Sequence, residues 1–175
     1  TETGVSIMLL DKEIDHGPLL AVEKIPLSGN ETFLELEEKL AKIGGKMICD
    51  LIDDLMSDKI KLKEQDHGDA TFTKKIEKED GFIDSKLILE GGTKNEVETT
   101  ERKIRAFNPD PGTYTTIETK NKKTLRVKIL TAKIEDNLHL DTSHTGKHPY
   151  KLIPEKVVPE GKKEMDWESF KRGNL

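Results

Sequence analysis

The first feature that could carry chemistry is a carboxylate between two apolar runs near the start of the chain. Residues 5–10 are mostly apolar, Asp15-His16-Gly17-Pro18 follows after a short polar stretch, and a second apolar run begins at Leu19. This pattern predicts strands over residues 5–10 and 18–25, joined by a turn. The turn would hold Asp15 in a fixed place that solvent or substrate can reach.

A second candidate is a cluster of basic residues in the second half of the chain. Residues 1–82 carry 11 basic and 19 acidic side chains, whereas residues 83–175 carry 18 basic and 15 acidic ones. Six of the basic residues fall on one expected hairpin: Lys120, Lys122, Lys123, Arg126, Lys128 and Lys133. Such a cluster can contact the phosphates of a nucleic acid, and it fits an ordinary solvated surface equally well.

The elements that would position these groups follow from the apolar periodicity. Thr32 with Glu35 forms a possible capping box, and apolar residues at three- and four-residue steps predict a helix over residues 32–57. Gly44-Gly45 in its middle predicts close packing against a sheet or a bend. A second helix is expected over residues 94–107, where Asn108-Pro109 would end it.

Short strands are expected in the remaining C-terminal part. They cover residues 114–119, 124–130, 138–140 and 151–158, and a terminal helix would place Trp167 and Phe170 on their core. Several alternating strands without a helical crossover argue for a small barrel. Residues 61–84 are charged and turn-rich and would cross between two folded units, with Phe72, Ile76, Phe82 and Ile83 as apolar anchors.

Composition limits the class of protein. The chain of 175 residues is 36% charged and 33% hydrophobic and contains no apolar stretch of bilayer length, so neither a membrane span nor a signal peptide is expected. Its single cysteine, Cys49, excludes an internal disulfide framework and favours a reducing, cytoplasmic setting. His144 and His148 are four residues apart, but Gly146 and Pro149 argue against a helix that would align them, so no metal site is expected.

Three segments resemble the methionyl-tRNA formyltransferase family. Residues 2–8, Glu-Thr-Gly-Val-Ser-Ile-Met, together with Asp15-His16-Gly17, are similar to the segment around the family's catalytic aspartate. Residues 102–115 resemble the start of its tRNA-recognising C-terminal domain, and residues 160–165 resemble a segment near the end of that domain. Two features depart from the family. Asp110 stands where a tryptophan is usual, and the part after Asn108 is shorter than in most members.

The resemblance implies an α/β part followed by a mainly β part. Residues 1–66 would be the C-terminal half of a Rossmann-like formyltransferase domain, residues 67–82 a linker, and residues 83–175 a small OB-like barrel that binds tRNA. The implied reaction transfers a formyl group from 10-formyltetrahydrofolate to the amino group of methionyl initiator tRNA. The complete protein would be a cytoplasmic monomer without DNA or membrane partners. The family's catalytic asparagine and histidine lie upstream of the matching region, so the chain by itself is expected to be nearly inactive.

The resemblance also assigns site residues. Asp15 would be the catalytic carboxylate, and Asp11, Glu13, Ile14 and Asp15 would border the folate. Asp11 and Glu13 could instead be solvated turn residues. The residues implied in tRNA binding are Arg102, Arg105, Lys120, Lys122, Lys123, Arg126, Lys162 and Lys163. Two other functions stay open, namely a formyltransferase that acts on an amino sugar nucleotide and a non-catalytic RNA-binding module in which Asp15 only forms a turn.

Overall fold

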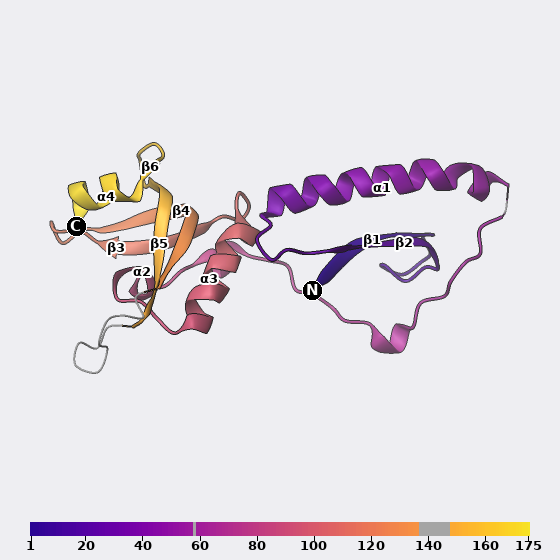
Figure 1. Cartoon of the computed structure of the whole chain (residues 1–175), viewed down its shortest axis with the longest axis horizontal. Coiled ribbons are helices and arrows are strands. Elements are labelled where there is room, and N and C mark those ends of the chain that lie inside the picture. Colours follow the sequence, from indigo (N-terminus) through magenta and orange to yellow (C-terminus); the bar gives the residue numbers. More distant parts are fainter. Residues whose placement is uncertain (58, 137–147) are drawn as a thin grey trace. The chain divides into compact units, whose positions relative to one another are not determined.

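The computed structural model describes residues 1–57, 59–136 and 148–175. Over these residues the chain forms two compact units, residues 1–74 and residues 75–175 (Figure 1). The first unit combines a strand pair with a long helix, and the second is built on an antiparallel sheet. The predicted order of an α/β part followed by a mainly β part is therefore confirmed. The division at residues 66 and 82 stays a prediction.

The first unit is a hairpin with one helix packed on it. Strands β1 (Glu2–Met8) and β2 (Leu19–Pro26) pair in antiparallel fashion, and helix α1 (Phe33–Met56) packs on β1. Figure 1 shows α1 running alongside the two strands. A Cβ atom added at Gly44 would lie 3.4 Å from Val5 Cγ1, an ordinary van der Waals contact, and one added at Gly45 would meet no atom within 4 Å. The helix does pack on the strand at Gly44, but the packing leaves room for a side-chain Cβ at both glycines.

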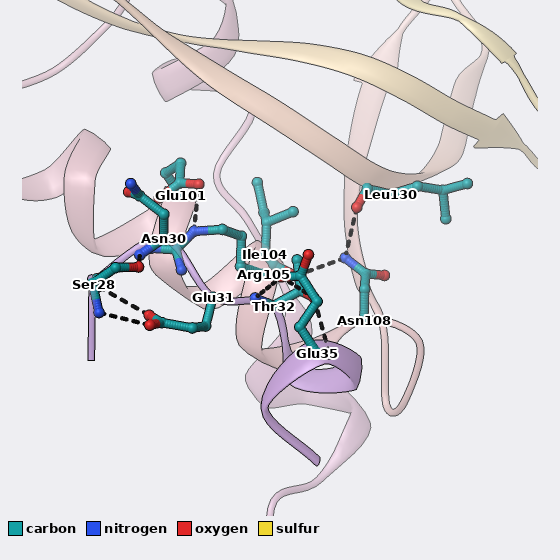
Figure 2. Close-up of polar contacts among 11 residues, drawn as sticks. Ser28, Asn30, Glu31, Thr32, Glu35, Glu101, Ile104, Arg105, Asn108 and Leu130 are labelled. Atoms are coloured by element: carbon teal, nitrogen blue, oxygen red, sulfur yellow. Dashed lines mark hydrogen bonds and ion pairs between the residues drawn. The ribbon is translucent and has the colours of Figure 1, made fainter. Parts of the chain in front are cut away.

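The start of α1 is fixed by side-chain caps that Figure 2 shows. The Thr32 hydroxyl accepts a hydrogen bond from the Glu35 amide at 3.4 Å, and the Glu35 carboxylate accepts one from the Thr32 amide at 2.9 Å. This is the predicted capping box. Just before it, the Glu31 carboxylate accepts hydrogen bonds from the amides of Ser28 and Gly29. These bonds, with the one from Ser28 as the largest cause, lower the pKa of Glu31 to about 2.

The second unit contains a sheet of order β3-β4-β5-β6. Its strands are β3 (Thr113–Glu118), β4 (Thr124–Asp136), β5 (Tyr150–Pro159) and β6 (Met165–Asp166), and neighbouring strands are antiparallel. Helix α3 (Lys94–Phe107) packs on β4 and β5, and α4 (Trp167–Asn174) packs on β5. One core joins sheet and helices, and its most enclosed side chains include Phe170, Ile104, Ile129 and Leu152.

The end of α3 is tied to the sheet by the side chain of Asn108. Its Nδ2 atom lies 2.8 Å from the Ile104 carbonyl oxygen, 3.1 Å from that of Ile129 and 3.2 Å from that of Leu130. Figure 2 shows this amide between the end of the helix and the strand. The helix stops where the sequence predicts, and the residue that stops it also pairs with carbonyl groups of β4.

Several sequence-based expectations need correction. In the part of the chain that the structure describes, the expected barrel is not closed, because β3 and β6 are the two edges of the sheet. Strand β4 extends to Asp136 rather than to residue 130. A bulge between Ile129 and Ala132 lets the strand continue beyond the segment in which apolar and basic residues alternate. The expected strand at residues 138–140 lies outside the described residues.

Three short elements and most of the expected apolar anchors also differ from the prediction. Helix α2 (Lys86–Leu89) and the 3₁₀ turns at His67–Asp69 and Lys78–Gly81 were not predicted. Among the expected apolar anchors Ile83 is buried, whereas Phe72 is 94% exposed. Ile76 and Phe82 are also exposed. In the described residues, no helix is long and apolar enough to cross a membrane.

Candidate functional site

The Asp15 turn joins β1 to β2. The Leu9 amide donates a hydrogen bond to the Pro18 carbonyl at 3.0 Å, which closes the base of the turn. Asp15 has a φ of 54° and an exposed side chain. Few residues other than glycine adopt this left-handed conformation, and aspartate is one that tolerates it. The structure therefore places Asp15 at the tip of a closed turn.

Gly17 lets the two sides of the turn approach each other. A Cβ atom added at this position would collide with the Leu9 carbonyl oxygen. Any other residue type would push the two sides apart and move Asp15.

The segment that follows α1 returns to this turn and holds it. Leu19 and Lys63 exchange backbone hydrogen bonds of 2.8 and 3.0 Å. The side-chain amide of Gln65 then donates to the carbonyl groups of Asp15, at 2.9 Å, and Gly17, at 2.7 Å. Sequence reasoning missed Gln65 because it lies in a charged stretch without periodicity, and nothing local indicates that this stretch pairs with residues 15–19.

A carboxylate and two imidazoles flank the turn. The Nδ1 atom of His16 lies 2.6 Å from Oδ2 of Asp11, and the His16 ring stacks on that of His67 with centroids 3.7 Å apart. The hydrogen bond to Asp11 raises the pKa of His16 above its usual value of 6.5, and the same bond lowers the pKa of Asp11 below 3.8. Asp11 also accepts a hydrogen bond from the Glu13 amide at 2.8 Å.

These shifts predict a limited pH window for the His16–Asp11 pair. Folding raises the pKa of His16, so its contribution to stability is complete below pH 6.5 and is lost as the pH rises through the raised value. Folding lowers the pKa of Asp11, so its contribution is complete above pH 3.8 and is lost as the pH falls through the lowered value. The pair therefore stabilises the turn most between pH 3.8 and pH 6.5.

An NMR titration of the His16 imidazole checks this. We expect a midpoint above 6.5 that moves down in the Asp11→Asn variant, because the hydrogen-bonding carboxylate is lost. The matched control is Asp69→Asn, which removes an exposed carboxylate from the same unit and should leave the midpoint in place. A midpoint that Asp11→Asn does not move would show that the pair is not formed in solution.

The eight candidate tRNA-binding residues do not form one cluster. Arg102 and Arg105 lie on α3, where Arg105 forms an ion pair with Glu101 at 2.7 Å (Figure 2). Lys120, Lys122 and Lys123 lie in the turn between β3 and β4, and the Lys120 amide donates to the Asn174 carbonyl. Lys162 and Lys163 lie in the turn between β5 and β6.

A cavity of about 500 Å³ brings two of these eight residues together. Arg126 and Lys162 line it with two further basic residues, Lys78 and Lys128, and with one acidic residue, Glu160. The Arg126 guanidinium lies 3.6 Å from the centre of the Tyr114 ring, which fixes its orientation. The sequence assigned Lys78 to a linker, so its place in this basic cavity was missed. The other six candidates do not line the cavity.

The sequence predicts no metal site at His144 and His148. His144 lies outside the described residues. Within the residues that the structure places, no group of three or more His, Cys, Asp or Glu side chains could hold a metal ion.

Two family models match the chain. The model described as formyl transferase matches residues 1–52, and the model of the formyl transferase C-terminal domain matches residues 75–151. A methionyl-tRNA formyltransferase from Roseiflexus castenholzii is 33% identical over 98% of this chain and 54% of its own length. Eight curated relatives that this chain matches are covered over 33% to 55% of their own length.

Solved structures with the same fold include a methionyl-tRNA formyltransferase and a sugar formyl transferase. Methionyl-tRNA formyltransferase from Clostridium thermocellum matches with a TM-score of 0.52 and 18% identity, over 90% of this chain and 56% of that one. WlaRD, a sugar 3N-formyl transferase studied with dTDP and 5-N-formyl-THF, matches with a TM-score of 0.55 and 19% identity, over 93% and 56%. At these identities the likeness shows the fold alone.

Proposed function

Because the chain belongs to the formyl transferase family, we propose that its complete protein transfers a formyl group from 10-formyltetrahydrofolate to the amino group of methionyl initiator tRNA. The Roseiflexus relative, 33% identical over 98% of this chain, supports methionyl-tRNA as the acceptor. The observation that carries the proposal is Asp15, an exposed carboxylate at the tip of the β1–β2 turn and within the residues that the N-terminal family model matches.

The chemistry explains what the turn would contribute. The acceptor nitrogen must lose a proton as its bond to the formyl carbon forms, and the formyl oxygen gains negative charge at the same time. The bond between the formyl carbon and N10 of the donor then breaks, and N10 takes up a proton as tetrahydrofolate leaves. Asp15 would take that proton through water, or it would orient an imidazole of the complete protein that does so. A carboxylate needs a fixed position for either role, and the closed turn provides it.

The same turn has side chains that suit the folate donor, which would supply the formyl group. Glu13 and Asp15 are exposed carboxylates that can accept hydrogen bonds from ring N–H groups. Ile14 is 93% exposed and could pack on a ring face. Asp11 is already bonded to His16 and to the Glu13 amide, so it would contribute least to a donor site.

For tRNA the structure favours the basic cavity over the other candidates. Arg126, Lys128, Lys162 and Lys78 converge there, and a phosphate group that entered it would meet several cations at once. Arg105 is a weaker candidate, because its guanidinium already pairs with Glu101 and both side chains are largely buried. The three hairpin lysines are exposed and remain candidates for additional phosphate contacts.

The salt dependence of tRNA binding tests the cavity. We expect the Arg126→Gln and Lys162→Gln variants of the complete protein to bind tRNA more weakly. Each should also reduce the slope of log affinity against log salt by about 0.7 to 0.9, because each releases one phosphate contact. The control is Lys39→Gln, which removes an exposed charge from α1. Unchanged affinity and slope in both variants would exclude the cavity, and charge reversal at Lys122 and Lys123 tests the hairpin in the same way.

A second candidate function differs only in the acceptor. Asp110 stands where the tRNA-specific family usually has tryptophan, and the fold is shared with a sugar formyl transferase, so an amino sugar nucleotide is the alternative. The experiment supplies 10-formyltetrahydrofolate to the complete protein with either methionyl initiator tRNA or a dTDP-amino sugar. Formylation of the tRNA at the higher kcat/KM supports our proposal, and preference for the sugar overturns it. If neither acceptor is formylated but tRNA is bound, the protein is an RNA-binding module.

A further inference from the structure

Gln65 is the residue outside the Asp15 turn that contacts it most directly. Its Nε2 atom donates to the carbonyl oxygens of Asp15 and Gly17, at 2.9 and 2.7 Å, and also lies 3.9 Å from the sulfur of Met8 at the end of β1. An amide nitrogen has two protons, and here two carbonyl groups accept them. The two acceptor carbonyl groups belong to the backbone that begins at Asp15 and ends at Gly17. One side chain therefore holds the backbone that carries the Asp15 carboxylate.

The turn needs such a tie because of the conformation of Asp15. A φ of 54° is rarely adopted by residues other than glycine and persists where the surroundings determine it. The bond to the Asp15 carbonyl fixes the peptide that follows the left-handed residue. Without it, Asp15 could relax toward a more common conformation, and the carboxylate would move with the backbone.

Gln65 is itself held on both sides along the chain. On one side, Leu19 and Lys63 exchange two backbone hydrogen bonds, which anchor the segment to the start of β2. On the other side, the His67 ring stacks on the His16 ring, with an interplanar angle of 8°. The Gln65 side chain is half-buried between these anchors, so its amide is positioned in advance.

We propose that Gln65 is a positioning residue for formyl transfer, whose side-chain amide holds the Asp15 turn in the conformation from which the carboxylate acts. This inference rests on the proposed function of Asp15. Gln65 touches the backbone of the turn and has no chemical role of its own. Its contribution should therefore appear in the rate of the reaction and should depend on the presence of the Asp15 carboxylate.

The test is a double-mutant cycle in the complete protein. Gln65→Met keeps the length and volume of the side chain and removes both donors. We expect kcat to fall by about 10- to 100-fold, because small displacements of a catalytic group cost up to about two orders of magnitude. The KM values for tRNA and for 10-formyltetrahydrofolate should stay within about twofold. In an Asp15→Asn background the same substitution should cause little further loss, since no carboxylate remains to be positioned.

A control variant and a second Gln65 variant separate loss of positioning from loss of folding. Lys61→Leu changes an exposed residue of the same segment and should leave kcat in place. If Gln65→Met does not fold, as judged by its thermal transition, Gln65→Asn replaces it. The shorter amide reaches only one of the two carbonyl groups, so an intermediate kcat is expected.

Two results would overturn the inference. One is an unchanged kcat in the folded Gln65 variant. The other is an equal fold loss of kcat when Gln65 is replaced in the parent protein and in the Asp15→Asn background. The proposed function fails in a different way, through full activity of the Asp15→Asn variant or no formylation by the parent protein.

Discussion

Replacing Asp15 by asparagine is expected to lower kcat for formyl transfer by the complete protein by about 100- to 10,000-fold, the usual contribution of a general acid or base. Asparagine has nearly the same shape as aspartate and tolerates the left-handed conformation at least as well, so the turn should keep its structure. It cannot take a proton. The substitution therefore separates the chemistry of the side chain from the geometry of the backbone.

The measurement is single-turnover formylation of methionyl initiator tRNA, which reports the chemical step without product release. Glu13→Gln is the matched control, because it removes an exposed carboxylate two residues earlier in the same turn. It should change the KM for the folate more than it changes kcat. An Asp15→Asn enzyme that retains more than a third of the parent rate would show that Asp15 only forms the turn.

The local elements could be predicted from the sequence because their signals lie within a few residues of each other. The capping box of Thr32 and Glu35 marked the start of α1, and Asn108-Pro109 marked the end of α3. The β1–β2 hairpin followed from two apolar runs around a glycine, although both strands extend beyond the predicted bounds at one end. These features depend on capping and periodicity, which short-range sequence determines.

The features that were missed depend on contacts between distant residues. Gln65 reaches Asp15 across 50 positions of sequence, and no local pattern indicates that pairing. Lys78 joins the basic cavity only because the sheet places Arg126 and Lys162 beside it. Phe72 was expected to pack, since its type is usually buried, but the structure leaves it exposed. Candidate residues could be named from the sequence, whereas which of them act together required the fold.

The two units differ in how much apolar surface they bury by themselves. Among the described residues, the buried apolar side chains of the first unit are Ile25 and Met47. Ile48 and Ile52 of α1 remain about half exposed, at 54% and 51%. The core that joins α3, the sheet and α4 lies in the second unit. Because hydrophobic burial is the main source of stability, substitutions in that core should have the largest effects on unfolding.

Phe170→Ala is expected to lower the free energy of unfolding of the second unit by about 3 to 5 kcal/mol, the usual cost of truncating a buried phenylalanine. The Phe170 side chain is completely buried, and its ring stacks on that of Trp167 with centroids 5.1 Å apart. The substitution removes this contact and leaves a cavity between α4 and β5. Because α4 is short, it cannot close the cavity without losing its own packing.

Trp167 provides the measurement, since it is the single tryptophan of the chain and lies in the same core. Urea unfolding followed by Trp167 fluorescence reports the unfolding of the second unit. In the Phe170→Ala variant the urea concentration at the midpoint should fall, while the slope of the free energy of unfolding against urea concentration should stay similar. Phe82→Ala is the matched control within the second unit: it removes the same side chain from a position that is 44% exposed and should lower the free energy of unfolding by clearly less. Equal effects of the two substitutions would mean that Phe170 does not anchor α4 to the sheet in solution.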